Sequence, residues 1–323
     1  MTRGFSIIIP TFNRARWLRR ALESVQRLHV PNDWPAEVVV IDNSSTDHTA
    51  SVVTDAQSKA SIPIRYVVEA RQGASHSRNR GIEEAHFEHL IYLDDDMTVM
   101  PDWLEAYREA QEYLQLDCVV GPVEPEFEEP PEPWIPRSVV TLVTAPYSRR
   151  GDEPILLPTE LAHQIPGCNF GVLRRAACEA GGFDVRIGPS AGNQIRGEDF
   201  DFGRKLVLLG KRVGYVPRCR IRHFIGRSKT TKEGLRLRWL GDGATARAFQ
   251  ALDGREPTSS FLIRRHLTMC KLMIRSIRMK LAGNRGEALR AELGARFWQG
   301  YLWRAPSLGR RNWPPRAIGS GTT

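Results

Sequence analysis

Three consecutive carboxylates, Asp94, Asp95 and Asp96, follow the apolar run "HLIYL". Neighbouring carboxylates repel one another, and a turn needs only one Asp or Asn. The triplet therefore indicates a cation site, because Mg²⁺ and Mn²⁺ prefer a few carboxylate oxygens together with phosphate oxygens. The alternative is a solvated turn or the start of the next helix. The position of the triplet at a strand end, among other polar motifs, favours the metal.

Polar residues also follow three other apolar runs in the first half of the chain: "PTFNR", "DNSSTD" and "RQGASHSRNRG". In an open α/β sheet, ligands bind beyond the carboxyl ends of the strands. Together these segments offer hydrogen-bonding groups for a base and ribose, a cation for phosphate and carboxylates for a metal. The sequence thus predicts a pocket for a nucleoside diphosphate bridged by a divalent ion, built from Thr11, Asn13, Asp42, Arg78 and the triplet.

The elements that must position these residues alternate between strand and helix. Apolar strands are expected at 5–10, 37–42, 64–70, 89–96 and 118–123, with helices at 14–28, 44–60, 73–86 and 100–114. This alternation predicts an α/β domain with a mostly parallel central sheet flanked by helices.

The alternation breaks in the second half. Residues 124–136 are acidic and rich in proline, and predict an irregular excursion. Residues 167–188 predict a strand, a helix and a turn. A helix at 197–210 and strands at 211–217 and 218–226 follow.

Composition narrows the classes of protein. No apolar run is long enough to span a bilayer, and the five cysteines show no zinc-like spacing. Reduced thiols and a cytoplasmic location are therefore expected.

Charge is unevenly distributed along the chain. Residues 224–323 contain 20 Lys and Arg and 6 Asp and Glu, a balance of +14, whereas the first 223 residues contain 26 and 31. The basic C-terminal part could face nucleic acid, an anionic membrane or a phosphorylated substrate.

A helix is expected at 258–283, with basic residues on one side and apolar residues across the other. A basic amphipathic helix can lie in a membrane interface. The alternative, which we favour from sequence, is that the apolar face packs on the α/β domain. The basic residues are Arg264, Lys271, Arg275 and Arg278, and the apolar residues are Leu262, Ile263, Leu267, Met273, Ile274 and Ile277.

The ordered motifs "SIIIPTFNR", "VVVIDNSSTD", "GASHSRNRGI", "IYLDDD", "GCNFGVLRR", "GGFD" and "GEDFDFGRKLVLLG" resemble those of family-two glycosyltransferases of the GT-A fold. The resemblance covers residues 6–228, roughly two-thirds of the chain. It implies one GT-A domain at 1–228, with a nucleotide-binding half (1–117) and an acceptor-binding half (118–228) on one sheet. Residues 229–323 would form a basic, mainly helical extension. The implied activity is transfer of a sugar from a nucleotide donor, with inversion and a divalent metal, Mg²⁺ or Mn²⁺.

The resemblance also implies roles for individual residues. In the donor site, Pro10, Thr11 and Asn13 approach the nucleotide and Asp42 accepts a hydrogen bond from the base. Arg78 lies where an arginine contacts the donor. The triplet is similar to the DXD element of the family, with Asp95 on the ribose and Asp96 on the metal, while Asp94 also belongs to the donor site.

In the acceptor half, the resemblance implies that Asn169 lines the sugar or acceptor pocket. Asp199 is the implied general base, with Glu198 beside it, and His223 is a further metal or diphosphate ligand. Each also has a structural interpretation. The two acids suit the first turn of a helix, and His223 and Asn169 could serve only to bond neighbouring groups.

Two rival functions fit the sequence less well. A nucleotidyltransferase would carry a glycine-rich basic loop after the first strand, and "PTFNRARW" has none. A non-catalytic nucleic-acid-binding protein would leave "GED" and "DDD" without purpose, and the tail has no recognisable RNA- or DNA-binding motif. We therefore expect no nucleic-acid partner.

The expected donor is a UDP-sugar, with GDP and dTDP open. The acceptor could be a saccharide, a lipid-linked molecule or a small molecule. Peripheral contact with the inner face of the membrane through 258–283 stays open.

Overall fold

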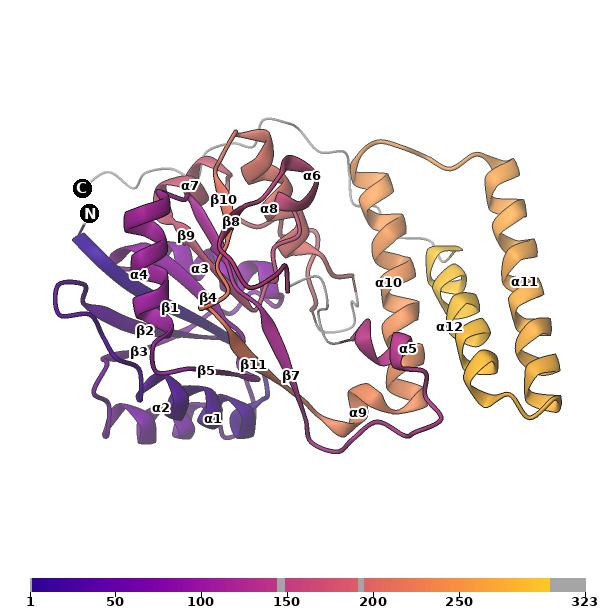
Figure 1. Cartoon of the computed structure of the whole chain (residues 1–323), viewed down its shortest axis with the longest axis horizontal. Helices are drawn as coiled ribbons and strands as arrows, with labels where there is room; N and C mark the ends of the chain where they lie inside the picture. Colours follow the sequence, from indigo (N-terminus) through magenta and orange to yellow (C-terminus); the bar gives the residue numbers. More distant parts are fainter. Residues whose placement is uncertain (1, 144–148, 191–194, 303–323) are drawn as a thin grey trace.

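Figure 1 shows the computed structural model of the chain, which describes residues 2–143, 149–190 and 195–302. Its main sheet has eight strands in the order β3-β2-β1-β4-β9-β6-β10-β8. They are β1 (Thr2–Thr11), β2 (Ala36–Asp42), β3 (Ile64–Val68), β4 (Phe87–Leu93), β6 (Cys118–Val120), β8 (Ile155–Leu156), β9 (Asn169–Leu173) and β10 (Val213–Tyr215). β1 pairs in parallel with β2 and β4, β2 with β3, and β6 with β10, whereas β9 runs antiparallel to both its neighbours. The predicted α/β fold with a mostly parallel sheet is confirmed.

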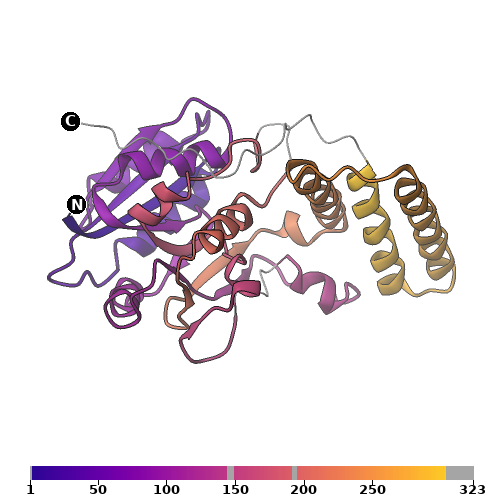
Figure 2. The ribbon, with the colours of Figure 1, turned by 90° about the horizontal axis from the view of Figure 1, so that it is seen from above.

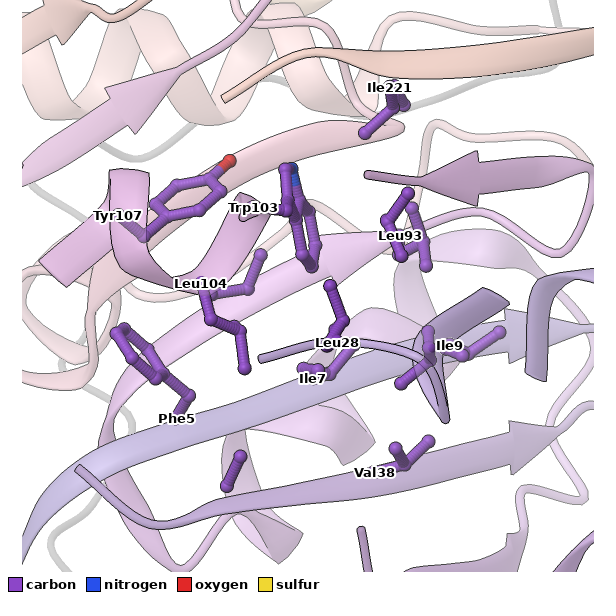
Figure 3. Close-up of a cluster of buried hydrophobic side chains, with 14 of the residues drawn as sticks. Phe5, Ile7, Ile9, Leu28, Val38, Leu93, Trp103, Leu104, Tyr107 and Ile221 are labelled. Carbon is purple, nitrogen blue, oxygen red and sulfur yellow. The ribbon is translucent and has the colours of Figure 1, made fainter. Parts of the chain in front are cut away.

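Helices cover both faces of this sheet because successive residues of each strand point to opposite sides. Ile7 and Ile9 of β1 belong to one buried cluster, shown in Figure 3, and Ile8 belongs to the other. The first cluster packs under α1 (Ala15–Val25), α2 (Thr49–Gln57) and α4 (Trp103–Leu114). The second packs under α3 (Ala74–Glu84), α6 (Thr159–Ala162), α7 (Arg174–Glu179) and α8 (Glu198–Leu208). The three layers hold the carboxyl ends of β1 and β4 in fixed positions.

A smaller sheet has the order β5-β11-β7. It contains β5 (Met97–Val99), β7 (Val123–Phe127) and β11 (Ile221–Ile225). The prediction that 124–136 is irregular is wrong for its first residues, which form β7. Pro125 is tolerated there because β7 is an edge strand, where a missing N–H leaves no partner unpaired. Nothing in the sequence pattern predicted β5, which directly follows the Asp triplet.

The C-terminal extension is helical, as predicted. It contains α9 (Arg227–Thr230), α10 (Lys232–Leu252), α11 (Ser259–Leu281) and α12 (Arg285–Leu302). The expected domain boundary after residue 228 therefore falls inside α9. α12 lies between α10 and α11 in both views (Figures 1 and 2). Leu235, Leu289 and Leu293 form a small core with residues of α5 (Arg137–Thr141) and the segment before it.

The apolar face of α11 does not pack as we expected from sequence. Ile263, Leu267, Met273, Ile274 and Ile277 are all more than half exposed. α11 instead packs on α12 through its opposite side, where Ser276 donates a hydrogen bond to the carbonyl of Ala288. No helix in the described ranges is long and apolar enough to cross a membrane.

Candidate active site

A cavity of about 1160 Å³ opens beyond the carboxyl ends of β1 and β4. Its lining includes most of the residues expected from sequence, namely Pro10, Thr11, Arg78, Asp94, Asp95, Asp96, Glu198, Asp199 and His223. The extension completes it with Trp239 and Phe249 of α10 and Phe297 of α12. The helical extension is thus part of the wall of the cavity.

Asp95 and Asp96 of the triplet are held by cations from two parts of the chain, Arg14 and Lys229. Nη1 of Arg14 lies 3.0 Å from Oδ1 of Asp95 and 2.8 Å from Oδ2 of Asp96. Nζ of Lys229 also lies 2.8 Å from Oδ2 of Asp96. The Thr11 hydroxyl donates to Asp95 over 2.9 Å. The positive charges of Arg14 and Lys229 therefore offset the cost of burying these carboxylates. This explains how three consecutive carboxylates can follow one strand.

The pKa values of Asp95 and Asp96 are shifted in opposite directions. Burial raises the pKa of Asp95, and the negative charge of Asp96 adds to that shift against the opposing effect of Arg14. Burial also acts on Asp96, but the nearby imidazole of His223 and the charges of Lys229 and Arg14 hold its pKa well below the usual range. Asp96 is therefore the stronger acid of the pair.

His223 reaches the triplet because β5 and β11 pair directly after it. The register sets His223 opposite Met97, and the Phe224 N–H donates to the carbonyl of Asp96 over 2.9 Å. Nε2 of His223 then lies 3.6 Å from Oδ2 of Asp96 and 3.1 Å from Nζ of Lys229. The unexpected strand β5 explains how residues 127 positions apart meet.

These residues fit one side of a divalent metal site. A carboxylate and an imidazole that border the cavity are suitable ligands for Mn²⁺. Across the described ranges no three His, Cys, Asp or Glu side chains are grouped to hold an ion. In this structure Nζ of Lys229 lies against both side chains, so a metal held by Asp96 and His223 would take the place of that ammonium group. Phosphate oxygens and water would complete the shell of such an ion.

Arg78 links the two acidic elements of the cavity. Its guanidinium lies 2.5 Å from Oε1 of Glu198 and 3.1 Å from Oδ1 of Asp94, and only 6% of its side chain is exposed. These two carboxylates neutralise the charge of Arg78, so the ion pairs hold Asp94 and Glu198 in place. Removing one partner of a buried ion pair is strongly destabilising, because the other charge is left unpaired.

Asp199 is placed differently from its neighbour Glu198. Its Oδ2 accepts the N–H of Gly167 over 2.9 Å and its Oδ1 accepts the N–H of Phe200. Burial and the negative charge of Glu198 raise the pKa of Asp199 to about 7, although Arg78 opposes the shift. A carboxylate with a pKa near neutrality is suited to accept a proton as a general base.

Two of the expected donor-site residues lie outside the cavity lining and organise its loops. Asp42 accepts the N–H of Ser45 over 2.9 Å and the hydroxyl of Tyr66. Asn13, whose φ is 53°, accepts the N–H of Thr46 over 2.7 Å. Asn13 therefore joins the loops after β1 and β2, whereas Asp42 ties the loop after β2 to β3.

Asn169 lies away from the cavity. The sequence motif predicts that it lines the acceptor pocket, whereas the structure buries it fully, outside the lining. Its amide donates to the carbonyls of Cys219 (2.7 Å) and Pro122 (3.1 Å), and its oxygen accepts the Tyr107 hydroxyl. Asn169 therefore ties β9 to the loops beside it.

Sequence reasoning missed several lining residues. Arg14 lies within the quoted "PTFNR", so its basic charge three residues after Thr11 was an available signal. Lys229 had no such signal, because only the β5–β11 pairing brings it to Asp96. Arg196 and Arg238 share Asp242, at 3.4 and 3.0 Å, on the side of the cavity formed by α10. Burial, together with the charge of Arg238, lowers the pKa of Arg196.

Curated relatives of the chain are glycosyltransferases or polysaccharide biosynthesis proteins. It is 26% identical over 249 residues to the succinoglycan biosynthesis protein ExoM of Rhizobium meliloti, covering 76% of this chain and 74% of that protein. It is 37% identical over 93 residues to a GalNAc(5)-diNAcBac-PP-undecaprenol beta-1,3-glucosyltransferase of Campylobacter jejuni. That second match covers 28% of this chain and 29% of the glucosyltransferase.

Solved structures show the same fold. The mannosyltransferase PcManGT from Pyrobaculum calidifontis, in complex with GDP-Man and Mn²⁺, has a TM-score of 0.56 at 18% identity, covering 90% of this chain and 74% of that one. S. aureus TarS 1-349 in complex with UDP has a TM-score of 0.54 at 14% identity, covering 91% and 90%. Both are GT-A enzymes, so the GT-A architecture is confirmed. The family model for glycosyl transferase family 2 matches residues 6–180, more than half of the chain, and the protein therefore belongs to that family.

Proposed function

We propose that the protein transfers a sugar from a nucleoside diphosphate donor to an acceptor hydroxyl with inversion, in a single displacement. The observation that carries this proposal is one cavity lined by both the Asp94–Asp96 triplet and Asp199. The triplet supplies the donor end, and Asp199 supplies a proton acceptor.

The donor we favour is a UDP-sugar, with GDP and dTDP as the alternatives. Thr11 and Asp95, which already bond each other, offer a hydroxyl and a carboxylate to the ribose. Of the two structural neighbours described, one binds UDP and the other binds GDP-Man. These ligands support a nucleoside diphosphate site but do not choose the base.

Asp96 and His223 would hold a divalent metal, Mg²⁺ or Mn²⁺. When bound, such an ion neutralises charge on a leaving diphosphate. Arg14 and Lys229 line the same end of the cavity and add fixed positive charge there. Preorganised cations at the position where charge develops lower the barrier to the reaction.

Asp199 acts as the general base. It takes the proton of the acceptor hydroxyl while that oxygen bonds to the anomeric carbon, and the bond from that carbon to the diphosphate oxygen breaks in the same displacement. Glu198 is committed to Arg78, so it is the less suitable proton acceptor. One displacement inverts the anomeric centre, and no covalent sugar–enzyme intermediate is needed.

The acceptor end lies toward the helical extension. Trp239, Phe249 and Phe297 offer apolar faces for a sugar ring, and Arg196 and Arg238 offer positive charge. This lining favours a saccharide that carries an anionic group, and the Campylobacter jejuni relative acts on an undecaprenol-linked diphosphate. A cytoplasmic location is part of the proposal, since all five cysteines are free thiols.

A thermal-shift panel of UDP, GDP, dTDP and CMP, with and without Mn²⁺, tests the donor proposal. A ligand that binds only the folded state raises the apparent melting temperature. We expect one nucleoside diphosphate to shift it most, and more so with Mn²⁺. Release of that diphosphate from the matching nucleotide-sugar then tests the activity. If no nucleotide shifts the transition, the proposed donor site is refuted.

A further inference from the structure

The side of α11 that faces away from α12 carries a continuous apolar stripe. Six exposed residues recur at spacings of three and four, which places them on one helical face. The stripe runs about 27 Å along the helix at 1.5 Å per residue. We call this stripe the outer face of α11; it comprises Ile263, Leu267, Cys270, Ile274, Ile277 and Leu281.

The five aliphatic side chains of the outer face are from 51% exposed at Ile274 to 84% at Leu281, and Cys270 is exposed as well. Single exposed apolar residues are normal, but a contiguous patch marks a surface that contacts something. Because α11 packs on α12 through the opposite side, the contact must be with a partner outside the described residues of this chain.

Charge identifies the kind of partner. α11 contains six Lys and Arg and no Asp or Glu. Arg275 and Lys280 reach acids of α12, and Arg265 stacks on Trp298. The remaining three, Arg264, Lys271 and Arg278, lie along one edge of the outer face and form no ion pair within the described ranges. An apolar stripe bordered by unpaired cations complements an anionic lipid surface.

A second copy of the chain fits less well. Packing two outer faces together would bring more cations to the contact, and α11 has no acidic residue to meet them. We therefore propose that the outer face of α11 binds an anionic phospholipid membrane, with the helix parallel to the surface.

The place of α11 in the molecule agrees with this role. It lies at the end of the molecule opposite the main sheet in both views (Figures 1 and 2), and α12 separates it from α10. The cavity is lined by α10 and α12 but not by α11. Membrane contact through the outer face therefore leaves the cavity lining unchanged.

Flotation of the full chain with vesicles tests the proposal without measuring turnover, so its outcome is independent of the proposed reaction. The probes are vesicles of phosphatidylcholine alone and vesicles that also contain phosphatidylglycerol. We expect the wild type to float only with the anionic vesicles and to detach as salt rises.

Two variants separate the contributions. Ile274→Ser with Ile277→Ser removes apolar contact and should abolish flotation. The triple variant Arg264→Gln, Lys271→Gln and Arg278→Gln should lower partitioning roughly a hundredfold. Its matched control changes three exposed arginines of the α/β domain, Arg27, Arg212 and Arg220, to Gln. The control loses the same net charge and should float like the wild type. Unchanged thermal unfolding shows that each variant is folded.

Three results would overturn the proposal. The first is a wild type that binds neither vesicle. The second is an equal loss of binding in the triple variant and its control, which would reduce the effect to net charge. The third is a wild-type oligomer that the Ile274→Ser, Ile277→Ser variant dissociates without any change in flotation, which would make the outer face a contact between copies.

Discussion

Replacing Asp199 with Asn removes the proposed proton acceptor and changes little else in shape. The carboxylate accepts two backbone N–H groups, from Gly167 and Phe200, one on each oxygen. Asn has a single acceptor oxygen, so one N–H loses its partner, which costs about 1–3 kcal/mol of stability. A positioned base contributes ~10²–10⁴-fold, which corresponds to a barrier increase of about 2.7–5.4 kcal/mol. We therefore expect kcat to fall by that factor in a protein that stays folded.

The pH profile adds a second readout. Because the pKa of Asp199 is raised to about 7, the carboxyl is protonated and inactive below that pH. The wild-type kcat should rise about tenfold per pH unit up to pH ~7 and then level off. Asp199→Asn should lose this rise along with its activity, since no base is left to titrate.

The assay is turnover at saturating donor, alongside donor affinity measured by calorimetry. Asp47→Asn is a matched control, since Asp47 also accepts two backbone N–H groups, from Ala15 and Thr49, and lies outside the cavity lining. The control should keep its turnover. Because Asp47 is exposed, water can replace the lost acceptor, so the control should lose less stability than Asp199→Asn. Near-normal turnover in Asp199→Asn would refute the assignment of the base, and lost donor binding would make Asp199 a donor-site or structural residue.

Three further substitutions test the geometry. Arg78→Met should lower the free energy of unfolding by about 3–5 kcal/mol in urea, because the buried Glu198 and the partly buried Asp94 lose their partner. The half-exposed Arg80→Met should cost less than ~1 kcal/mol, and equal losses would contradict the buried role of Arg78. Gly167→Ala would place a Cβ 2.7 Å from Oδ2 of Asp199, so kcat should fall with donor affinity retained, and unchanged kcat would argue against a fixed carboxylate. Asn169→Ala should destabilise the fold by about 1–3 kcal/mol for each group left unpaired and leave the acceptor KM unchanged; a selective rise in KM would restore its expected place in the acceptor pocket.

The sequence predicted the sheet well because buried parallel strands read as apolar runs, and the polar residues after β1 and β4 must share one sheet edge. It predicted β6 and β10 but missed the short strands β5, β7 and β8. β5 has three residues, too few for a periodic signal, and only its pairing with β11 brings His223 and Lys229 to Asp96. Asn169 shows a different limit: a motif gives the residue type but not the direction of its side chain.

The same limit applies to α11. Its amphipathic pattern was evident, but periodicity does not say which face meets the rest of the chain. The structure shows that the less regular side, with Ser276 buried, packs on α12. The apolar residues therefore stay exposed.

Calorimetry of nucleoside diphosphate binding, with and without Mn²⁺, tests the metal-dependent donor site most directly. The wild type should bind more tightly with Mn²⁺. Asp96→Ala should weaken binding in Mn²⁺ far more than in its absence, because Asp96 and His223 border the same point of the cavity. An equal loss of affinity in both conditions, or a wild-type affinity that is the same with and without Mn²⁺, would contradict a metal held by Asp96.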